Sequence, residues 1–180
     1  MSKGAVYFSN DNEYYTPKRY VEMFGPFDYD PATTTEKAID LGIPNYDTIE
    51  TNGLLSDWTK YRRIWINPPF TDKKAFLEKA VDTYLKTKPD IFFLAPIEFL
   101  TTKVFHEQIN KMRGGGGVKL FLPNGRIKFE SGLGKSSKSP AFGSIVFKIQ
   151  DSNELYFFDL NCNNVTIGPS MDANGQYSLF

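Results

Sequence analysis

A short apolar run, Ile64-Trp65-Ile66, leads directly into Asn67-Pro68-Pro69-Phe70, and this junction allows the chain few conformations. Proline fixes its own φ angle and keeps the residue before it out of the helical region. The segment therefore predicts a strand that ends in a rigid, extended turn. The Asn67 side chain and a backbone carbonyl can accept hydrogen bonds there, and the Phe70 ring can stack. These residues predict a site for a planar heterocycle that carries an amino group, adenine above all.

Apolar segments of strand length alternate with helical segments, which predicts an α/β fold. Residues 91–95 are apolar throughout, as in a strand covered on both faces at the centre of a parallel sheet. We predict one domain with a mostly parallel central sheet and an antiparallel hairpin at one side. Residues 1–150 form its main part, and a C-terminal strand and tail at 151–180 pack on it. The expected helices are 17–24 (capped by Thr16), 34–41, 72–86 and 98–112; the expected strands are 27–30, 62–66, 91–95, 118–122 and the hairpin pair 144–149 and 155–160.

The composition excludes several kinds of chemistry. Cys162 is the single cysteine and His106 the single histidine, which excludes an intramolecular disulfide and a cysteine-based zinc site and argues against histidine-rich metal chemistry. No apolar run reaches transmembrane length, and the N-terminus lacks the apolar core of a signal peptide. We therefore expect a cytoplasmic protein with no membrane association and no bound metal.

Charge is unevenly distributed although the net charge is zero. Residues 1–60 hold 5 Lys or Arg against 10 Asp or Glu, whereas residues 103–138 hold 8 against 2. An acidic half and a basic segment fit a cationic cofactor at one end of the molecule and a polyanion at the other. A solvated basic face explains the same counts equally well.

Polar residues and prolines follow three of the predicted strands. Asp28 and Asp30 lie at the end of the first strand, residues 67–70 follow the second, and Pro96 ends the third. Because ligands bind at the carboxyl ends of the strands in open α/β sheets, these segments are expected to form one site.

Several segments, taken in order, resemble the small phage-type DNA N6-adenine methyltransferases. The resemblance covers roughly residues 7–149, and residues 67–70 together with the order of the segments carry it. The matching segments are Thr16-Pro17, Phe27-Asp28-Tyr29-Asp30-Pro31-Ala32, Asn52-Gly53-Leu54, Asp57-Trp58, Trp65-Ile66-Asn67-Pro68-Pro69-Phe70, Leu94-Ala95-Pro96, Gly125-Arg126-Ile127-Lys128-Phe129 and Pro140-Ala141-Phe142.

The resemblance implies a Rossmann-like methyltransferase fold and S-adenosylmethionine as the methyl donor. It implies that Asn67, Pro68, Pro69 and Phe70 are the catalytic residues that hold the target base. The donor-binding residues that we expect on this basis are Thr16, Pro17, Asp28, Asp30, Pro31, Ala32, Asp57 and Asn67. Two features depart from the family pattern: the segment after Asp30 has no glycine-rich turn, and Asn52 stands where an aspartate is more common.

The activity implied is methyl transfer to the N6 amino group of adenine in double-stranded DNA. The base would leave the helical stack to reach the pocket, and Phe70 would stack on it. The phosphate contacts expected are Lys103, Arg113, Arg126, Lys128, Lys135 and Lys138, with Lys111 and Lys119 as further candidates, and the loop 130–139 would order on DNA. The protein would work in the host cytoplasm if a phage encodes it.

Two other functions fit the same residues. One is a non-catalytic relative that binds DNA or the donor. The other keeps the chemistry but changes the acceptor to RNA, to cytosine N4 or to a protein glutamine. Because 180 residues leave little room for a target-recognition domain, specificity is short, or a homodimer or another partner supplies the remainder.

Overall fold

The computed structural model describes residues 14–112, 117–130 and 142–151 with their side chains. It also describes the backbone of four later strands. In chain order the elements are α1 (Lys18–Glu22), β1 (Tyr29–Asp30), α2 (Thr35–Leu41), β2 (Asn45–Tyr46), β3 (Arg63–Ile66), α3 (Lys73–Thr87), β4 (Asp90–Pro96), the 3-10 helix η1 (Ile97–Thr101), α4 (Lys103–Asn110), β5 (Gly117–Pro123), β6 (Ser144–Gln150), β7 (Glu154–Phe158), β8 (Val165–Ile167), β9 (Ser170–Met171) and β10 (Tyr177–Ser178).

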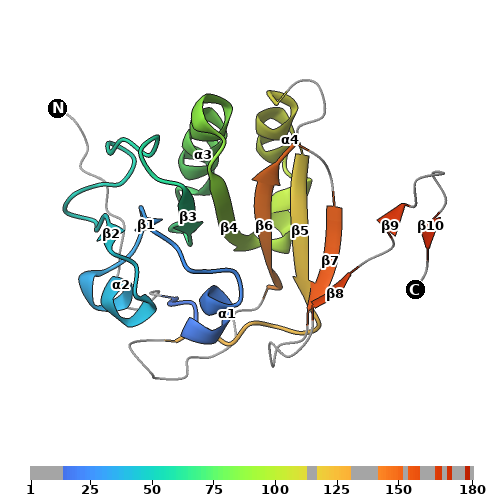
Figure 1. Cartoon of the computed structure of the whole chain (residues 1–180), viewed down its shortest axis with the longest axis horizontal. Helices are drawn as coiled ribbons and strands as arrows, with labels where there is room; N and C mark the ends of the chain where they lie inside the picture. The colour runs from blue at the N-terminus through green and yellow to red at the C-terminus, as the bar shows by residue number, and fades with distance from the viewer. Residues whose placement is uncertain are drawn as a thin grey trace.

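Eight strands form one sheet in the order β2-β1-β3-β4-β6-β5-β7-β8 (Figure 1). The strands β2, β1, β3 and β4 are mutually parallel, and β6 is antiparallel to both of its neighbours, β4 and β5. The mostly parallel α/β sheet that the sequence predicts is therefore confirmed. A separate pair, β9 and β10, is antiparallel.

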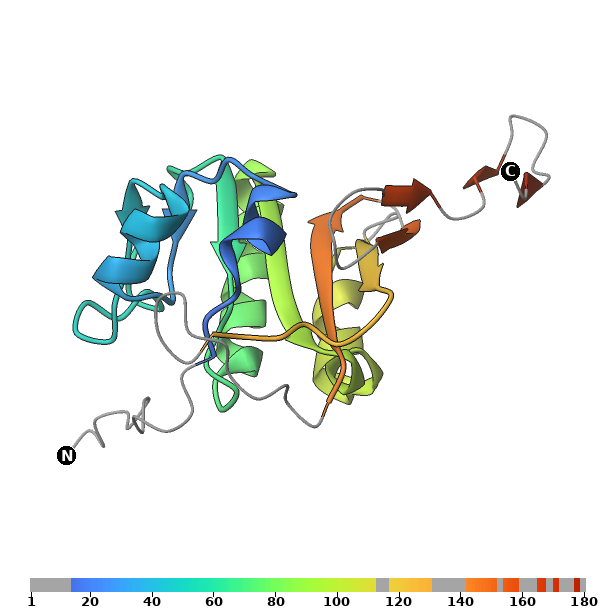
Figure 2. The same cartoon turned by 90° about the horizontal axis from the view of Figure 1, so that it is seen from below.

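Helices cover both faces of the sheet (Figure 2). Alternate residues of β3 and β4 point to opposite faces, so the sheet supports two apolar cores. Ile64, Ile66 and Phe93 pack with the apolar residues of α3 and α4, whereas Trp65 and Phe92 pack on the other side with α1 and the segment that precedes β1. Burial of both faces explains why β4 is apolar throughout.

Local sequence signals explain the ends of α2. The Thr34 side chain accepts a hydrogen bond from the Lys37 N–H at 3.2 Å, as an N-cap residue does. Gly42 ends the helix in the left-handed conformation with φ 68°, which glycine adopts without steric cost. The helix predicted over residues 34–41 is therefore confirmed.

Two helix predictions are wrong in detail. Thr16 does not cap α1, because Pro17 occupies the cap position and no side chain caps that helix. Residues 98–112 do not form one helix, because Thr102 adopts extended backbone between η1 and α4. Its hydroxyl accepts from the Phe105 N–H at 3.2 Å, so Thr102 starts a new helix.

The strand partner predicted for residues 155–160 is also wrong. We expected this strand to form a hairpin with residues 144–149, but β7 pairs in parallel with β5. The antiparallel partners of β6 are β4 and β5. Turn residues between two strands indicate a hairpin locally, but here pairing with more distant strands overrides that signal. Among the described residues, the structure contains no helix long and apolar enough to cross a membrane.

The strand order reverses direction at the boundary between β1 and β3. From β1 the chain crosses through α2 to β2 on one side, and it then returns to place β3 on the other side of β1. Loops that leave β1 and β3 at their carboxyl ends therefore diverge and open a crevice, where ligands bind in folds of this kind. Asp30 ends β1, and Asn67 directly follows β3.

Candidate active site

The turn after β3 holds Asn67 in one orientation. Its side-chain Nδ2 donates a hydrogen bond of 2.9 Å to the backbone carbonyl of Tyr14. With the nitrogen directed to Tyr14, Oδ1 is the amide atom left to accept a hydrogen bond from a ligand. Ile66 before it is fully buried, so the strand fixes the position from which this side chain projects.

A narrow aromatic pocket lies on one side of the turn. Asn67, Pro68 and Phe70 line it together with Phe129 and Phe142. The Phe70 and Phe142 rings meet edge to face, with their centroids 4.9 Å apart. The cavity measures about 10 Å³, which is the volume of a single water at most. A planar ring system can enter only after these side chains move apart.

Lys73 also lines the aromatic pocket, and we did not predict it from the sequence. Its ammonium donates to the Phe70 carbonyl and lies 4.9 Å from the centre of the Phe70 ring. Partial burial lowers the pKa of this lysine. A lysine three residues after the aromatic position, in the first turn of α3, is visible in the sequence, but its contact with Phe70 depends on how the turn folds.

A second cavity, of about 330 Å³, lies on the other side of the same turn. Its walls come from the loop after β1, the loop after β2 and the start of α3. It therefore opens at the crevice between β1 and β3. The lining residues include Pro31, Ala32, Thr33, Asn52, Gly53 and Pro69. The volume is within the range of pockets that hold small ligands.

Pro69 belongs to this larger cavity, whereas Asn67, Pro68 and Phe70 belong to the aromatic pocket. Residues 67–70 are thus the wall that the two cavities share. A group bound in one cavity could meet a group bound in the other at Asn67. This arrangement suits transfer of a small group between two ligands.

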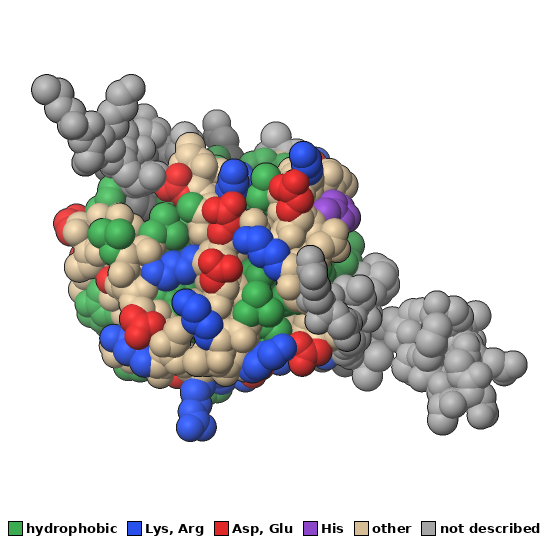
Figure 3. Space-filling view, turned by 90° about the horizontal axis from the view of Figure 1, so that it is seen from above, with side chains coloured by type: hydrophobic (Ala, Val, Ile, Leu, Met, Phe, Trp, Pro, Cys, Tyr) green, Lys and Arg blue, Asp and Glu red, His purple; other side chains and the backbone are tan. Residues whose placement is uncertain are grey.

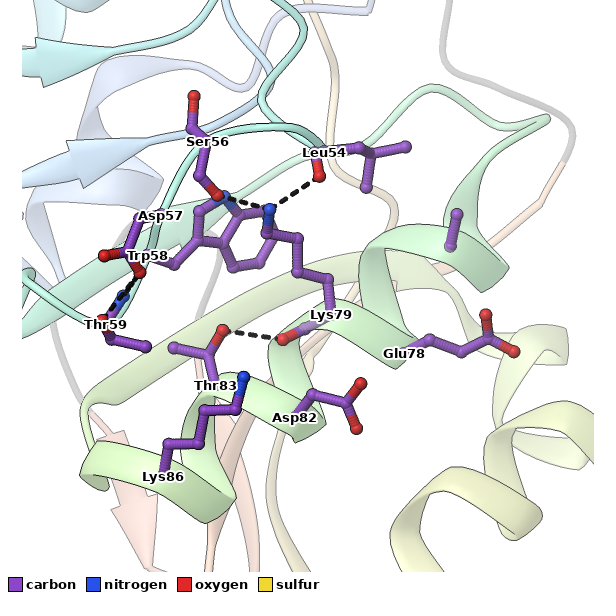
Figure 4. Close-up of a pocket in the computed structure, with 11 residues that line it drawn as sticks. Leu54, Ser56, Asp57, Trp58, Thr59, Glu78, Lys79, Asp82, Thr83 and Lys86 are labelled. Carbon is purple, nitrogen blue, oxygen red and sulfur yellow. Dashed lines mark hydrogen bonds between the residues drawn. The ribbon is translucent and has the colours of Figure 1, made fainter.

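Close backbone packing forms the floor of the larger cavity. A Cβ atom added to Gly53 would lie 2.0 Å from the carbonyl oxygen of Pro31, so only glycine fits. The indole N–H of Trp58 donates to the Gly53 carbonyl at 2.8 Å. Lys79 lies over the Trp58 ring and donates to the carbonyls of Leu54 and Ser56 (Figure 4). These contacts hold the loop 53–58 against the end of β1.

Asp30 is buried beside this cavity, with 2% of its surface exposed. Its Oδ1 accepts a hydrogen bond of 3.0 Å from the Ala32 N–H, which shapes the turn after β1. Burial raises the pKa of Asp30 to about 7, and the hydrogen bond from Ala32 opposes that shift. Among the described residues, no charged group contributes to the shift. A cationic ligand would supply the missing counter-charge.

Thr16 is a second polar group at this end of the molecule. Its hydroxyl is buried and has no hydrogen-bond partner among the described residues. Tyr15 pairs with Glu130, and Tyr14 contacts Asn67, so the segment that contains Thr16 and Pro17 runs beside the turn at residues 67–70. A buried hydroxyl without a partner is unfavourable unless a ligand or water satisfies it.

Two of the carboxylates expected at the donor site lie elsewhere. Asp28 precedes β1, and its carboxylate accepts from the N–H groups of Arg62 and Arg63, which places it at the amino end of the sheet. Asp57 is exposed and accepts from the backbone and hydroxyl of Thr59 (Figure 4). It lines a separate groove of about 520 Å³, between its loop and α3, which is larger than either cavity at residues 67–70. We therefore remove both residues from the donor-binding set.

The basic residues are spread over several parts of the structure. Arg126 and Lys128 are exposed after β5, at the carboxyl edge, on either side of the buried Ile127. Lys103 begins α4 and pairs with Glu107 at 3.5 Å. Lys111 lies at the opposite end of that helix, and Lys119 lies within β5. Arg113, Lys135, Lys138 and most of the loop 130–139 are outside the described residues.

The described side chains on the face where α3 and α4 lie form no block of one charge. Figure 3 shows Lys and Arg side chains interspersed with Asp and Glu side chains there. Lys74 pairs with Glu78 at 3.9 Å on α3, as Lys103 does with Glu107 on α4. Such exposed pairs are typical of a solvated helix face. Lys103 therefore has less support as a phosphate contact than Arg126 and Lys128.

A family model described as DNA N-6-adenine-methyltransferase (Dam) matches residues 11–163 of this chain. The chain belongs to this family. The resemblance drawn from its residues is thereby confirmed.

One relative and one solved structure were compared with this chain. The chain is 24% identical over 147 residues to the DNA N-6-adenine-methyltransferase of Escherichia phage T1; this match covers 75% of the chain and 60% of that relative. The chain thus spans less than two thirds of the length of this relative. A solved structure of a candidate class I S-adenosylmethionine-dependent methyltransferase from Listeria monocytogenes matches with a TM-score of 0.36 and 10% identity, over 71% of this chain and 46% of the other.

The candidate site of this member of the DNA N-6-adenine-methyltransferase family contains residues that we did not predict from the sequence. Tyr14, Lys73 and Lys79 all contact the active-site loops. Gly53 could have been identified, because it stands in a segment that matches the family. The contacts of Tyr14 and Lys79 join segments that are far apart in the chain, so no local pattern indicates them.

Proposed function

We propose that this chain transfers a methyl group from S-adenosylmethionine to the N6 amino group of adenine in double-stranded DNA. The observation that carries the proposal is the position of residues 67–70 between two cavities. The larger cavity suits a donor, and the aromatic pocket suits a flat base. Membership of the DNA N-6-adenine-methyltransferase family supports the same reaction.

The larger cavity fits the chemistry of the donor. Asp30, which is buried next to the lining residue Pro31, would offer a carboxylate to the positive charge of the ligand. The Thr16 hydroxyl, buried in the segment beside residues 67–70, would offer a further hydrogen bond. Leu55 and Ile49 line the cavity and are exposed by 81% and 42%, so they present an apolar rim to a ring system. Pro31, Ala32 and Pro69 complete the wall. When bound, S-adenosylmethionine would supply an electrophilic methyl group.

The aromatic pocket would hold the adenine once it is flipped out of the duplex. Asn67 Oδ1 and the Pro68 carbonyl would accept the two hydrogens of the N6 amino group. These hydrogen bonds favour a more tetrahedral nitrogen and stabilise the positive charge that develops on it. Phe70 would stack on the base. Because the cavity holds one water at most, entry of the base requires the Phe70 and Phe142 rings to separate.

No side chain needs to remove a proton before methyl transfer. The exocyclic nitrogen would attack the methyl group in line, and the electrons of the breaking carbon–sulfur bond would pass to sulfur, which leaves as a neutral thioether. The methylated nitrogen would then release one proton to water. The amide of Asn67 is neutral, so it acts by orientation and electrostatics. Holding the two reactants in register is the main contribution of the site.

Double-stranded DNA is the proposed partner, and action in the cytoplasm is part of the same proposal. Arg126 and Lys128 would contact phosphates at the carboxyl edge of the sheet. A homodimer, which would supply additional recognition surface, is part of the same proposal.

The experiment that tests the function is transfer of labelled methyl from S-adenosylmethionine to unmethylated duplex DNA, followed by nucleoside mass analysis. The expected product is N6-methyladenine. Label in N4-methylcytosine would contradict the base assignment. Label in RNA or in protein glutamine, with none in DNA, would contradict the acceptor. Donor binding with no transfer to any of these would indicate a non-catalytic relative.

We expect the salt dependence of DNA binding to distinguish Lys128 from Lys111. Lys128→Gln removes an expected phosphate contact and should reduce the slope of log K against log salt by about 0.9. Lys111 was itself a candidate phosphate contact, but it ends α4 shortly before β5 begins, at the amino edge of the sheet, so Lys111→Gln serves as the matched control. Fluorescence anisotropy titrations at several salt concentrations measure both. Equal slopes for Lys128→Gln and the unchanged protein would remove Lys128 from the DNA-binding surface.

We expect the buried Asp30 to make stability depend on pH. Its pKa is about 7 in the folded chain and near 3.8 when unfolded, so between these values the folded state binds more protons. The free energy of unfolding contributed by Asp30 therefore falls as pH rises from about 4 to 7. Asp30→Asn can still accept from the Ala32 N–H, and it should gain stability over the unchanged protein between pH 5 and pH 8. Denaturant titrations at both pH values measure the difference.

Binding of a cationic donor should offset the loss of stability that the ionised Asp30 causes. Binding beside Asp30 favours the ionised carboxylate, so donor affinity should rise from pH 6 to pH 8 in the unchanged protein and stay flat in Asp30→Asn. Calorimetry in buffers of different ionisation enthalpy measures the proton release. If donor affinity had the same pH dependence in the unchanged protein and in Asp30→Asn, Asp30 would not face the donor.

A further inference from the structure

A buried ion pair joins α2 to the segment after β5. The Lys37 side chain is 3% exposed, and its Nζ lies 3.0 Å from Glu130 Oε2 and 2.8 Å from Asp40 Oδ2. A buried ammonium is unfavourable unless carboxylates compensate it. Asp40 lies on the same helix as Lys37, so it holds the lysine locally. Glu130 lies 93 residues away and is the partner that links Lys37 to another part of the fold.

The backbone of Glu130 pairs with that of Tyr15. The Tyr15 N–H donates to the Glu130 carbonyl at 3.0 Å, and the Glu130 N–H donates to the Tyr15 carbonyl at 2.9 Å. This isolated antiparallel bridge is the contact that places the segment before α1 against the segment after β5. It lies immediately beside the Tyr14 carbonyl, which accepts from Asn67.

One peptide unit connects the two contacts. In a trans peptide the C=O and the N–H point in opposite directions. The Tyr14 carbonyl accepts from Asn67 Nδ2 on one side of the unit, and the Tyr15 N–H donates to Glu130 on the other. Rotation of this peptide would break both hydrogen bonds together. The orientation of the Asn67 amide is therefore coupled to the position of Glu130.

We propose that Glu130 and Lys37 are positioning residues that set the orientation of the Asn67 amide through the Tyr14–Tyr15 peptide. The proposal rests on the methyl-transfer function proposed above. Asn67 can accept a hydrogen bond from the N6 amino group only when its oxygen faces the base. If the amide rotates, its own N–H groups face those of the amino group, and donor meets donor.

Ring contacts supply a second link along the same route. The Tyr14 ring meets Phe70 edge to face at 5.6 Å and meets Phe129, the neighbour of Glu130, at 5.7 Å. Phe129 and Phe70 both line the aromatic pocket. A shift of Glu130 would therefore move the stacking ring as well as the amide. Asp40 has no comparable contact with this segment among the interactions of the described residues, which makes it the natural control.

Glu130→Gln tests the proposal against Asp40→Asn. Each variant removes one carboxylate partner from the same ammonium group, but only Glu130 adjoins the active-site peptide. We expect Glu130→Gln to lower kcat by about tenfold while KM for the donor stays within about twofold. Asp40→Asn should leave kcat within about twofold. Equal losses of kcat in the two variants, or no loss in Glu130→Gln, would overturn the proposal.

A spectroscopic readout makes the test independent of catalysis. The side-chain amide of Asn67 gives a pair of NMR signals that can be assigned by their loss in Asn67→Ala. We expect Glu130→Gln to shift these signals toward those of an unbonded amide, and Asp40→Asn to leave them in place. If the protein transfers no methyl group at all, the proposed function fails, but this comparison still decides whether Glu130 positions Asn67.

Two further variants keep the proposal testable if Glu130→Gln does not fold. Lys37→Arg keeps a cation at the position and should retain most of the activity. The double variant Lys37→Met/Glu130→Gln removes both charges and leaves no unpaired buried ammonium, so it should fold even if Glu130→Gln does not. Its kcat should fall as far as that of Lys37→Met alone, because both changes break one pathway. A double variant with unchanged kcat and unchanged Asn67 signals would refute the positioning role.

Discussion

Asn67→Ala is expected to abolish methyl transfer, with a loss of at least about a hundredfold in kcat. The change removes the side-chain oxygen that would accept from the N6 amino group, and it removes the hydrogen bond to the Tyr14 carbonyl. Pro69, which contributes to the wall of the larger cavity, stays in place, so donor affinity should change little. Single-turnover transfer of labelled methyl to DNA measures the first effect, and calorimetry with S-adenosylmethionine measures the second.

Asn45→Ala is the matched control for this substitution. The Asn45 side chain also donates through Nδ2 to a backbone carbonyl at 2.9 Å, that of Asp28, but it lies at the amino end of the sheet. Its loss should leave the rate of methyl transfer unchanged. If Asn67→Ala kept full activity, residues 67–70 would have no catalytic role. If it lost donor binding as completely as transfer, Asn67 would belong to the donor site first.

Gly53→Ala is expected to disrupt the donor cavity. The added Cβ would lie 2.0 Å from the Pro31 carbonyl oxygen and 2.8 Å from its carbonyl carbon. Both atoms belong to the backbone, so the loop 53–58 must move away from the end of β1. We expect donor affinity to fall by about tenfold or more and the free energy of unfolding to fall by about 1–3 kcal/mol. Calorimetry and denaturant titration measure these two quantities.

Gly143→Ala provides the comparison for Gly53→Ala. Among the described residues, a Cβ at Gly143 would meet only Ile97 Cγ2, at 3.7 Å, which is an ordinary contact. This variant should bind the donor normally. Gly143 lies between Phe142 and Ser144, which both line the aromatic pocket. Gly143→Ala therefore also shows whether a change beside the aromatic pocket alone affects donor binding. Normal donor affinity in Gly53→Ala would show that the donor binds outside the cavity beneath Pro31.

These two substitutions separate the two halves of the proposed reaction. Asn67→Ala should affect transfer with little effect on donor binding, whereas Gly53→Ala should affect donor binding first. The distinction follows from the positions of the residues, since the larger cavity includes Gly53 and excludes Asn67. Both variants should still contain the α/β sheet, which circular dichroism can verify.

Local chemistry allowed much of the fold to be predicted. The helix 34–41 was located, and its ends at Thr34 and Gly42 depend only on residues within one turn of the chain. The apolar runs of β3 and β4 were located because strands buried on both faces have no polar side. The turn at residues 67–70 follows β3 because proline cannot continue a strand in the middle of a sheet.

Other features depended on contacts between distant segments. Residues 144–150 and 154–158 have the local pattern of a hairpin, but β6 pairs with β4 and β5. Asp28 and Asp57 stand in segments that match the family, yet backbone N–H groups and Thr59 engage their carboxylates away from the cavity. A carboxylate near the end of a strand can accept hydrogen bonds from the backbone or contact a ligand, and the sequence does not distinguish these two roles.

By itself, the sequence determined that a strand would end in a rigid Asn-Pro-Pro-Phe turn, because proline restricts the backbone wherever it occurs. The tertiary structure decided which two cavities that turn separates and how the Asn67 side chain is oriented. The amide is held by Tyr14, 53 residues earlier, and the larger cavity depends on the close approach of Gly53 to Pro31. Such contacts exist only after the chain has folded, because they join segments that have no local reason to meet.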